Sequence, residues 1–489
     1  MNSAFLLHRA LVWLALIATL LTTSSGYAAN GTTNTLPSLG DHSSGIVSLD
    51  QEYRLGRAWL RQLRAHVSTI EDPLIYDYLE HMLYLLASNS DLSNPRLELV
   101  VINSPQINAF AVPGGVIGLN AGLLIHARAA DELAAVIAHE LAHLSQRHFA
   151  RGQEYSQRTQ WATAAALLAS VVLMATAGSD AGMAALATTQ ATAIDQQLRF
   201  SRNNEREADR IGMQTLVRAD LSPEAMPNFF EQLLKSSRYS GTIPPEFLLT
   251  HPVTQSRISD SRNRASGLPR KTYSDDLEFE LMQIRTRVAY TREETAAITE
   301  LETNLKENKT LDQEVTRYGL AYAYFRANRF NDALETLAPL LEKRPNRITY
   351  LYTKAAILMG QNQYKDAISV LEAALSFSPE NYPLSMAYAE SLLRDGRPEQ
   401  ALKILKKQQR AKPLLPSPWY LMAECHGKTH NSLGVHEARA EFYYLTGRVD
   451  KALEQLRYAA ALAKEDFQAD ARIKQRTKEM QHSKDDLKL

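Results

Sequence analysis

Three stretches of this sequence share one pattern: RFNDALETL at 329–337, QYKDAISVL at 363–371 and RPEQALKIL at 397–405. An alanine, a leucine and a later proline each recur every 34 residues. The columns are Ala333, Ala367 and Ala401; Leu337, Leu371 and Leu405; and Pro345, Pro379 and Pro413. Such a period indicates repeated helix pairs, because alanine lets helices approach closely and proline cannot continue a helix.

The pattern returns once more, out of register, as RVDKALEQL beginning at Arg448. Ala452 lies 51 residues beyond Ala401, so 17 extra residues intervene. The period resembles the tetratricopeptide repeat, in which stacked helix pairs form an α-solenoid. We expect residues 311–489 to form this array. Its concave face would dock peptide or protein partners, and an inert spacer is the alternative.

Composition excludes several classes of protein. Of 489 residues, 54 are Lys or Arg and 54 are Asp or Glu, which disfavours a strongly basic nucleic-acid binder and an acidic disordered chain. The single cysteine, Cys425, rules out an intramolecular disulfide and a cysteine-rich zinc module. A metal site in this chain would therefore use histidine and carboxylate ligands.

The N-terminus is typical of a secretory signal. Arg9 precedes an apolar run at 11–21, and Gly26 and Ala28 are small residues suited to cleavage after Ala28. We therefore expect residues 1–28 to be a signal peptide, residues 29–47 a polar mature tail, and the protein to be periplasmic. A retained N-terminal anchor is the alternative, which the short apolar run disfavours.

A second apolar run, WATAAALLASVVLMATAG, occupies residues 161–178. Its length allows a membrane span, but it is dominated by alanine and contains polar residues. A buried or groove-lining helix is our leading interpretation. Membrane insertion, or peripheral contact with the outer membrane, is the alternative.

Periodicity predicts the remaining elements. We expect helices from 48 to 92, a strand at 97–105, and two short extended pieces at 108–124 about a Pro-Gly-Gly turn. We further expect one helix at 131–152, one at 189–217, a loop-rich stretch at 236–272 and charged helices at 276–310.

The chemistry begins with His139-Glu140-Leu141-Ala142-His143, an H-E-x-x-H motif on a predicted helix. The two histidines are four residues apart and share one face, so they can bind one metal ion. Glu140 would then lie beside the bound water. A surface helix with two incidental histidines is the alternative, and the apolar context argues against it.

A third ligand is expected from the helix at 189–217, where Glu205 and Asp209 lie one turn apart on one face. Glu205 could complete a His₂Glu site, while Asp209 orients a ligating histidine. Glu207 is the competing candidate for the third ligand. A solvated charged helix without any ligand is the alternative interpretation of this stretch. His148 comes too early after His143 for an extended three-histidine motif, so we interpret it as an orienting or structural residue.

The segments HELAH at 139–143, SRNNEREAD at 201–209 and NAFAVPGGVIGLNAGLL at 108–124 resemble the M48 family of zinc metallopeptidases. The resemblance covers about residues 48–265. It implies a mainly α fold with a small β element, in which a zincin-type domain at 48–270 and a helical connector at 271–310 precede the repeats.

The same resemblance implies one Zn²⁺ per chain, bound by His139, His143 and Glu205, with Glu140 as catalytic base. It also implies an edge strand to which a substrate peptide adds by β-augmentation. The residues of that strand are Asn108, Ala109, Phe110, Ala111 and Val112.

His251 stands in a proline-flanked loop, PPEFLLTHP at 244–252. An ordinary loop histidine is one interpretation. The sharper hypothesis is that His251 approaches the zinc as a fourth ligand and holds the enzyme latent, since a closed tetrahedral site cannot bind the catalytic water. No firm oxyanion donor emerges, and Arg202 and His251 are the candidates.

Signal peptide, peptidase and repeats together resemble the periplasmic members of this family that act in quality control of outer-membrane proteins. That resemblance implies unfolded or stalled β-barrel proteins as substrates, and the β-barrel assembly machinery as partner of the repeats. Two alternatives stay open. One is a chaperone or adaptor in which proteolysis is secondary, and the other is a membrane-anchored sensor.

Overall fold

The structure is a computed structural model that describes residues 48–155, 202–239, 245–273, 276–291, 293–307 and 312–485. The predicted signal peptide, the polar tail and the apolar run at 161–178 lie outside these residues. Among the helices that are described, none combines the length and the apolar character needed to cross a membrane.

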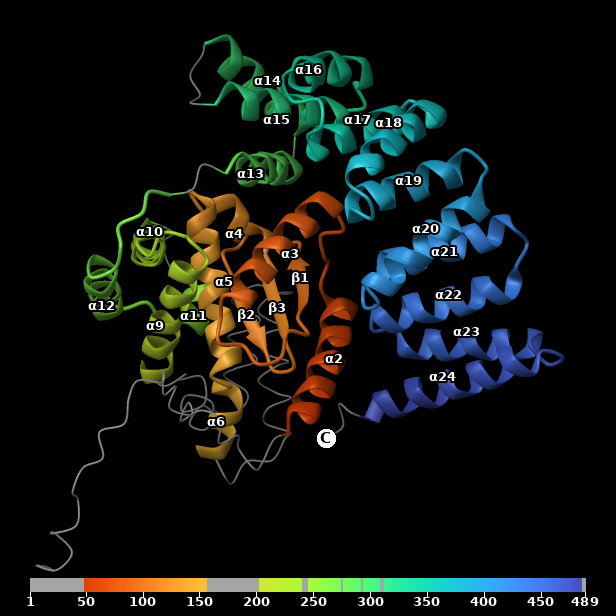
Figure 1. Cartoon of the computed structure of the whole chain (residues 1–489), viewed down its shortest axis with the longest axis horizontal. Helices are drawn as coiled ribbons and strands as arrows, with labels where there is room; N and C mark the ends of the chain where they lie inside the picture. Colours follow the sequence, from red (N-terminus) through yellow and green to blue (C-terminus); the bar gives the residue numbers. More distant parts are fainter. Residues whose placement is uncertain are drawn as a thin grey trace, which may run out of the picture. The chain divides into compact units, whose positions relative to one another are not determined.

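A three-stranded sheet lies at the centre of the N-terminal half (Figure 1). Its strands are β1 (Glu98–Ile102), β2 (Ala109–Val112) and β3 (Val116–Asn120), in the spatial order β1-β3-β2. β3 pairs in parallel with β1 and antiparallel with β2. Of the described strands, β2 therefore forms one edge of the sheet.

Successive side chains along each strand point to opposite faces of the sheet, and both faces are buried. On one face, Val100, Phe110 and Val116 pack against Trp59 of helix α2 (Leu49–His66). On the other face, residues such as Ile117 pack into the core that contains helix α5 (Ala130–Ser145). Helices thus cover the sheet on both sides and hold β2 beside α5.

The turn between β2 and β3 requires glycine at two positions. Gly114 and Gly115 have φ values of 84° and 83°, in the left-handed region that side chains disfavour. A Cβ on Gly114 would also lie 2.3 Å from the backbone oxygen of Glu52. The predicted Pro-Gly-Gly turn is confirmed.

Ten helices are described in the part of the chain that surrounds the sheet, excluding the three gaps within it. They are α2 (Leu49–His66), α3 (Pro73–Ser88), α4 (Ala121–His126), α5 (Ala130–Ser145), α6 (His148–Tyr155), α9 (Arg202–Arg218), α10 (Ala225–Tyr239), α11 (Glu246–Thr250), α12 (Gln255–Ser266) and α13 (Leu277–Tyr290).

Two predictions about these helices are wrong. The single helix predicted at 131–152 is broken, because Arg147 has a φ of 48° and separates α5 from α6. The stretch predicted as loop-rich at 236–272 contains helix α12, which Thr254 caps by accepting a hydrogen bond from the backbone of Arg257. Both differences depend on residues at a helix end, Arg147 and Thr254, whose local conformation the apolar periodicity does not predict.

The C-terminal half is a stack of helix pairs, and its charged helices begin before the repeats. The described helices are α14 (Glu294–Lys306), α15 (Gln313–Arg326), α16 (Phe330–Lys343), α17 (Ile348–Gly360), α18 (Tyr364–Phe377), α19 (Tyr382–Arg394), α20 (Pro398–Ala411), α21 (Pro416–Lys428), α22 (Ser432–Leu445), α23 (Val449–Leu462) and α24 (Phe467–Asp485). The prediction of a mainly helical fold with a small sheet followed by helical repeats is confirmed.

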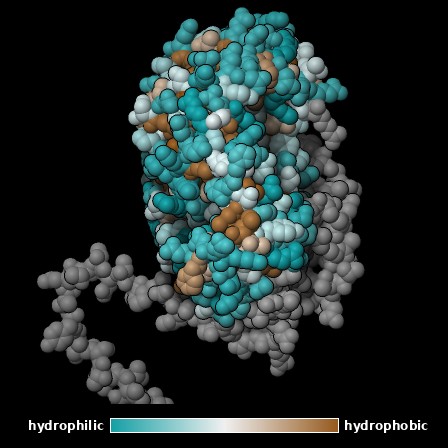
Figure 2. All heavy atoms as spheres, turned by 90° about the vertical axis from the view of Figure 1, so that its right-hand side faces the viewer, coloured by the Kyte–Doolittle hydropathy of each residue, from teal (hydrophilic) through white to brown (hydrophobic). Residues whose placement is uncertain are grey.

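Polar contacts join the repeats to α2 and α3. The Arg64 guanidinium donates a hydrogen bond of 2.7 Å to the carbonyl of Leu414, and Lys412 pairs with Glu80. The outer surface over the repeats is mostly hydrophilic and carries separate apolar patches (Figure 2). The large apolar side chains that are exposed on the described repeats are Phe377, Tyr420, Tyr458, Leu462 and Phe467.

Candidate metal centre and active site

Helix α5 presents the H-E-x-x-H motif inside the molecule. The exposed fractions of His139 and His143 are 1% and 6%, and Glu140 is equally buried. Because the histidines are one turn apart, their Nε2 atoms face each other at 3.0 Å. Two ring nitrogens that converge in a buried site suit a shared metal ion.

Helix α9 brings two carboxylates to these histidines. Glu205 lies 3.5 Å from Nε2 of His139 and 3.4 Å from Nε2 of His143, and Asp209 lies 3.0 Å from Nδ1 of His139. Gly212 permits this approach, because a Cβ there would lie only 3.1 Å from the backbone nitrogen of His139. Glu205 thus faces Nε2 of His139, and Asp209 faces Nδ1 of the same ring.

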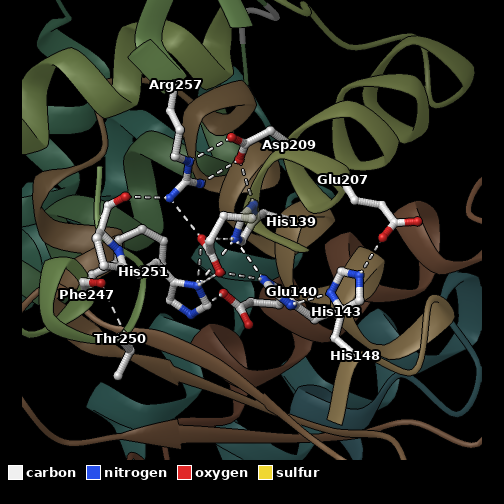
Figure 3. Close-up of polar contacts among 12 residues, drawn as sticks. His139, Glu140, His143, His148, Glu207, Asp209, Phe247, Thr250, His251 and Arg257 are labelled. Carbon is white, nitrogen blue, oxygen red and sulfur yellow. Dashed lines mark hydrogen bonds and ion pairs between the residues drawn. The ribbon is translucent and has the colours of Figure 1, made fainter. Parts of the chain in front are cut away.

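His251 enters the same site at the C-terminal end of α11 (Figure 3). Its Nδ1 lies 3.2 Å from Glu205, and its Nε2 lies 3.4 Å from Glu140. Its ring stacks on Phe247, with the ring centroids 4.8 Å apart. The loop histidine is therefore a buried neighbour of both the base and the acidic ligand.

The donor set fits zinc. His139, His143, Glu205 and His251 each offer a ligand atom, and these atoms all lie within 4.8 Å of one another. Imidazole nitrogens with one carboxylate form a zinc-binding set known in hydrolases, and all four residues are buried.

Electrostatics within the cluster are strongly coupled. Burial opposes the charge on Glu205, but the imidazoles of His251 and His139 keep its pKa well below the usual value. Burial likewise lowers the pKa of His143, so this ring is neutral. For His139 the carboxylates of Asp209 and Glu205 overcome burial and raise the pKa to about 10. A metal ion held at Nε2 of His139 would therefore have to displace a proton.

Glu140 has a different environment. Burial raises its pKa, which suits a general base that must hold a proton near neutral pH. The backbone of Ala111 in β2 is close enough to this carboxylate to oppose part of that rise. Strand β2 therefore lies beside Glu140.

Sequence reasoning missed Arg257, on helix α12. Its guanidinium donates hydrogen bonds of 2.8 and 2.7 Å to Asp209 and pairs with Glu205 at 2.8 Å. It also donates to the carbonyl of Pro252 and covers the Phe230 ring. Arg257 thus compensates two buried carboxylates and ties α12 to α9.

Three other residues considered from the sequence lie outside the four-residue cluster. Arg202 is exposed at the first position of α9, and no described contact joins it to the cluster. Glu207 faces His148 at 3.2 Å instead of the cluster. His148 itself is buried, and its Nδ1 lies 2.8 Å from Nδ1 of His143.

Comparison with known proteins agrees with this site. The model of peptidase family M48 matches residues 74–265, and a tetratricopeptide repeat model matches residues 358–425. A model of subunit 3 of the anaphase-promoting complex, cyclosome, matches residues 305–374. The peptidase match contains the H-E-x-x-H helix, α9 and His251, so the chain is a metallopeptidase.

Similar proteins extend over nearly the whole chain. The beta-barrel assembly-enhancing protease of Escherichia coli (strain K12) is 35% identical over 446 residues, which cover 90% of this chain and 91% of that protein. The protein of the same name from Yersinia pestis is 35% identical over 447 residues, with the same coverage.

More distant relatives match a smaller part. Mitochondrial metalloendopeptidase OMA1 of Arabidopsis thaliana is 33% identical over 171 residues, which cover 35% of this chain and 32% of that protein. With its M48 peptidase part and its tetratricopeptide repeats, this chain belongs to the family of the beta-barrel assembly-enhancing proteases.

Proposed function

We propose that this chain is a periplasmic zinc endopeptidase that degrades misfolded or stalled outer-membrane β-barrel proteins and assists their assembly. The names of its relatives support the substrate class, and the secretory character of residues 1–28 supports the compartment. The convergence of His139, His143 and Glu205 around one point, with Glu140 beside it, carries the proposal.

In this proposal His139, His143 and Glu205 hold one Zn²⁺. Bound zinc supplies a Lewis acid that polarises the scissile carbonyl and lowers the pKa of a coordinated water. Glu140 accepts the proton of the attacking water and delivers it to the leaving amine. Asp209 fixes the ring of His139, and Arg257 holds Asp209 in place.

The substrate is held as an added strand. β2 is an edge strand of the described sheet, and the backbone of Ala111 lies beside the base. A peptide paired with residues 108–112 would therefore run past Glu140. An extended segment of an unfolded β-barrel protein is suited to such pairing, whereas a folded barrel has its strands already paired.

His251 regulates access in this proposal. Its two ring nitrogens lie within 3.4 Å of Glu205 and Glu140, so its ring lies between the acidic ligand and the base. As a fourth protein ligand it would take the place of the catalytic water and keep the enzyme latent. Displacement of the loop that carries it would open the site.

The repeats supply the partner surface. Their separate exposed apolar patches support docking of a protein, and the β-barrel assembly machinery is the proposed partner. A chaperone or adaptor role is compatible with the same surface.

The test compares the mature chain with Glu140→Gln and His251→Ala, and uses the exposed His81→Ala as a matched control. Zinc content is measured by elemental analysis, and cleavage is measured on an unfolded β-barrel protein. We expect about one zinc per chain, a 10²–10⁴-fold loss of cleavage for Glu140→Gln, and increased cleavage for His251→Ala. The control should behave like the unmodified chain.

Other outcomes contradict separate parts of the proposal. A chain without zinc would refute the metal site. Equal or lower cleavage by His251→Ala would refute latency. If Glu140→Gln still restores β-barrel assembly in cells and removal of residues 311–489 does not, the chaperone or adaptor role dominates.

A further inference from the structure

The outer nitrogen of His143 has a partner of its own. Nε2 of His143 faces the cluster, while Nδ1 lies 2.8 Å from Nδ1 of His148. Nε2 of His148 in turn lies 3.2 Å from Glu207, which also accepts a 3.0 Å hydrogen bond from Arg151. Figure 3 shows His143, His148 and Glu207 in this row, whose outer member Glu207 is partly exposed.

Hydrogen-bond chemistry allows one arrangement of protons along the row. If His143 ligates through Nε2, its ring proton lies on Nδ1. Two nitrogens 2.8 Å apart share a single proton, so Nδ1 of His148 must accept it. The proton of His148 then lies on Nε2, where the Glu207 carboxylate accepts it.

We propose that His148 and Glu207 are positioning residues that hold His143 in the tautomer whose Nε2 lone pair is directed at the metal. This inference rests on the proposed zinc site. The two histidine ligands are then supported differently. Asp209 contacts Nδ1 of His139 directly, and Glu207 acts on His143 through a second imidazole. Hydrogen-bond partners of this kind orient a ligating ring and strengthen its bond to the metal.

The break between α5 and α6 makes this row possible. In a continuous helix His148, five residues after His143, would be rotated by about 140° from it, on a different face. Arg147 instead adopts a φ of 48°, which is unfavourable for a residue with a side chain, and the chain turns His148 back onto α5. The Arg147 guanidinium pairs at 2.9 Å with the buried Glu52, which holds this turn in place.

A packing role alone predicts different behaviour. His148 is 2% exposed and its ring lies edge-on to that of His143, so removal of the ring would also loosen the core. Glu207 separates the two roles, because its side chain is partly exposed and its loss should leave the fold intact. If Glu207 acts only through His148, its substitution should matter little once His148 has been replaced.

The experiment measures zinc affinity of the full mature chain by competition with a chromophoric chelator, in the absence of any substrate. The variants are Glu207→Ala, His148→Phe and the double variant, with circular dichroism as a check on folding. Glu231→Gln is the matched control, since Glu231 also pairs with an arginine on a neighbouring helix, at 2.7 Å from Arg262, outside the row.

We expect Glu207→Ala and His148→Phe each to weaken zinc binding about 10–100-fold, with no change for the control. The double variant should be no weaker than His148→Phe alone. Wild-type affinity in Glu207→Ala would overturn the inference, and so would fully multiplicative losses in the double variant. Absence of zinc from the unmodified chain would instead refute the proposed function itself.

Discussion

The core of the repeats and the peptidase site are both buried, but they depend on different features of the sequence. In the repeats, the alanine and leucine columns at 34-residue spacing are fully buried at every position from Ala333 to Leu405. In the peptidase, the cluster unites residues from α5, α9, α11 and α12, and up to 118 positions separate His139 from Arg257. A local sequence period is enough to predict the repeat core. The peptidase site depends instead on ion pairs between residues far apart in the sequence.

The energetic character of the two regions differs accordingly. The repeat core around Ala367 and Leu371 consists of small and branched apolar residues. Truncation of such a residue lowers the free energy of unfolding by an amount that grows with the volume removed. The peptidase site buries two carboxylates, Glu205 and Asp209, and both pair with the single guanidinium of Arg257. Removal of one partner there leaves an uncompensated charge, which costs more than a cavity of similar size.

Substitution of Arg257 should therefore have the largest effect on stability. Arg257→Met preserves much of the side-chain volume but leaves Asp209 without its bidentate partner. We expect the free energy of unfolding to fall by about 3–5 kcal/mol, measured by urea denaturation. Arg262→Met is the matched control on the same helix, because that arginine is half-exposed. Its loss should be below about 1 kcal/mol. Equal losses for both variants would contradict the comparison.

The sequence predicts part of this site and cannot predict the rest. His139 and His143 are found because four-residue spacing on a helix places both rings on one face, and Glu205 follows from the need for a third ligand. Arg257 is not found, because Arg262 and Arg264 lie in the same polar stretch and no periodic feature distinguishes them. Packing of α12 onto α9 alone selects Arg257.

Truncation in a leucine column should have the next largest effect. Leu371 is fully buried on α18 and contacts the core formed with α17 and α19. We expect Leu371→Ala to lower the free energy of unfolding by about 2–4 kcal/mol, through lost apolar burial and the resulting cavity. Leu462→Ala, at a half-exposed position on α23, should change it by less than about 0.5 kcal/mol. A small loss at Leu371 would mean that the stack closes around the cavity.

An added side chain in the alanine column tests close packing from the opposite direction. Ala367 is fully buried, and we expect its small side chain to let neighbouring helices pack closely. We expect Ala367→Leu to cost about 1–3 kcal/mol by overpacking, although it adds apolar surface. Thermal unfolding of the full chain measures this shift. A stabilised variant would show that the alanines reflect helix propensity and not close approach.

The repeats also show where a sequence period fails. Helices α16, α18, α20 and α22 begin at Phe330, Tyr364, Pro398 and Ser432, each 34 residues after the last. In α22, however, the alanine of the column is replaced by Val435. The motif RVDKALEQL lies at the start of α23, which directly follows α22. Its 17-residue offset therefore corresponds to one additional helix. The structural period thus continues for one repeat beyond the sequence period, because packing tolerates substitutions that erase the motif.

One buried carboxylate in the repeats gives the smallest expected effect and tests whether charge matters there at all. Glu314 on α15 accepts hydrogen bonds from Lys343 and Arg344 at 2.6 and 2.7 Å and from Tyr350 at 2.7 Å. Burial would raise its pKa, but these partners lower it to about 2. Because the native pKa lies below the unfolded value of 4.5, Glu314 stabilises the fold above about pH 4.5. This contribution is lost as the pH falls toward 2.

The side chains of Lys343 and Arg344 are 61% and 44% exposed, so solvent screens their attraction for Glu314. We therefore expect Glu314→Gln to cost only about 1 kcal/mol at pH 7, well below the effect of Arg257→Met. The difference from wild type should shrink between pH 4.5 and pH 2, whereas Glu335→Gln, at an exposed position of α16, should show no such trend. A pH-independent loss would mean that Glu314 acts through packing and neutral hydrogen bonds. A loss as large as that at Arg257 would show that the repeats, too, depend on a specific long-range charge, and the contrast between the two regions would then be one of degree.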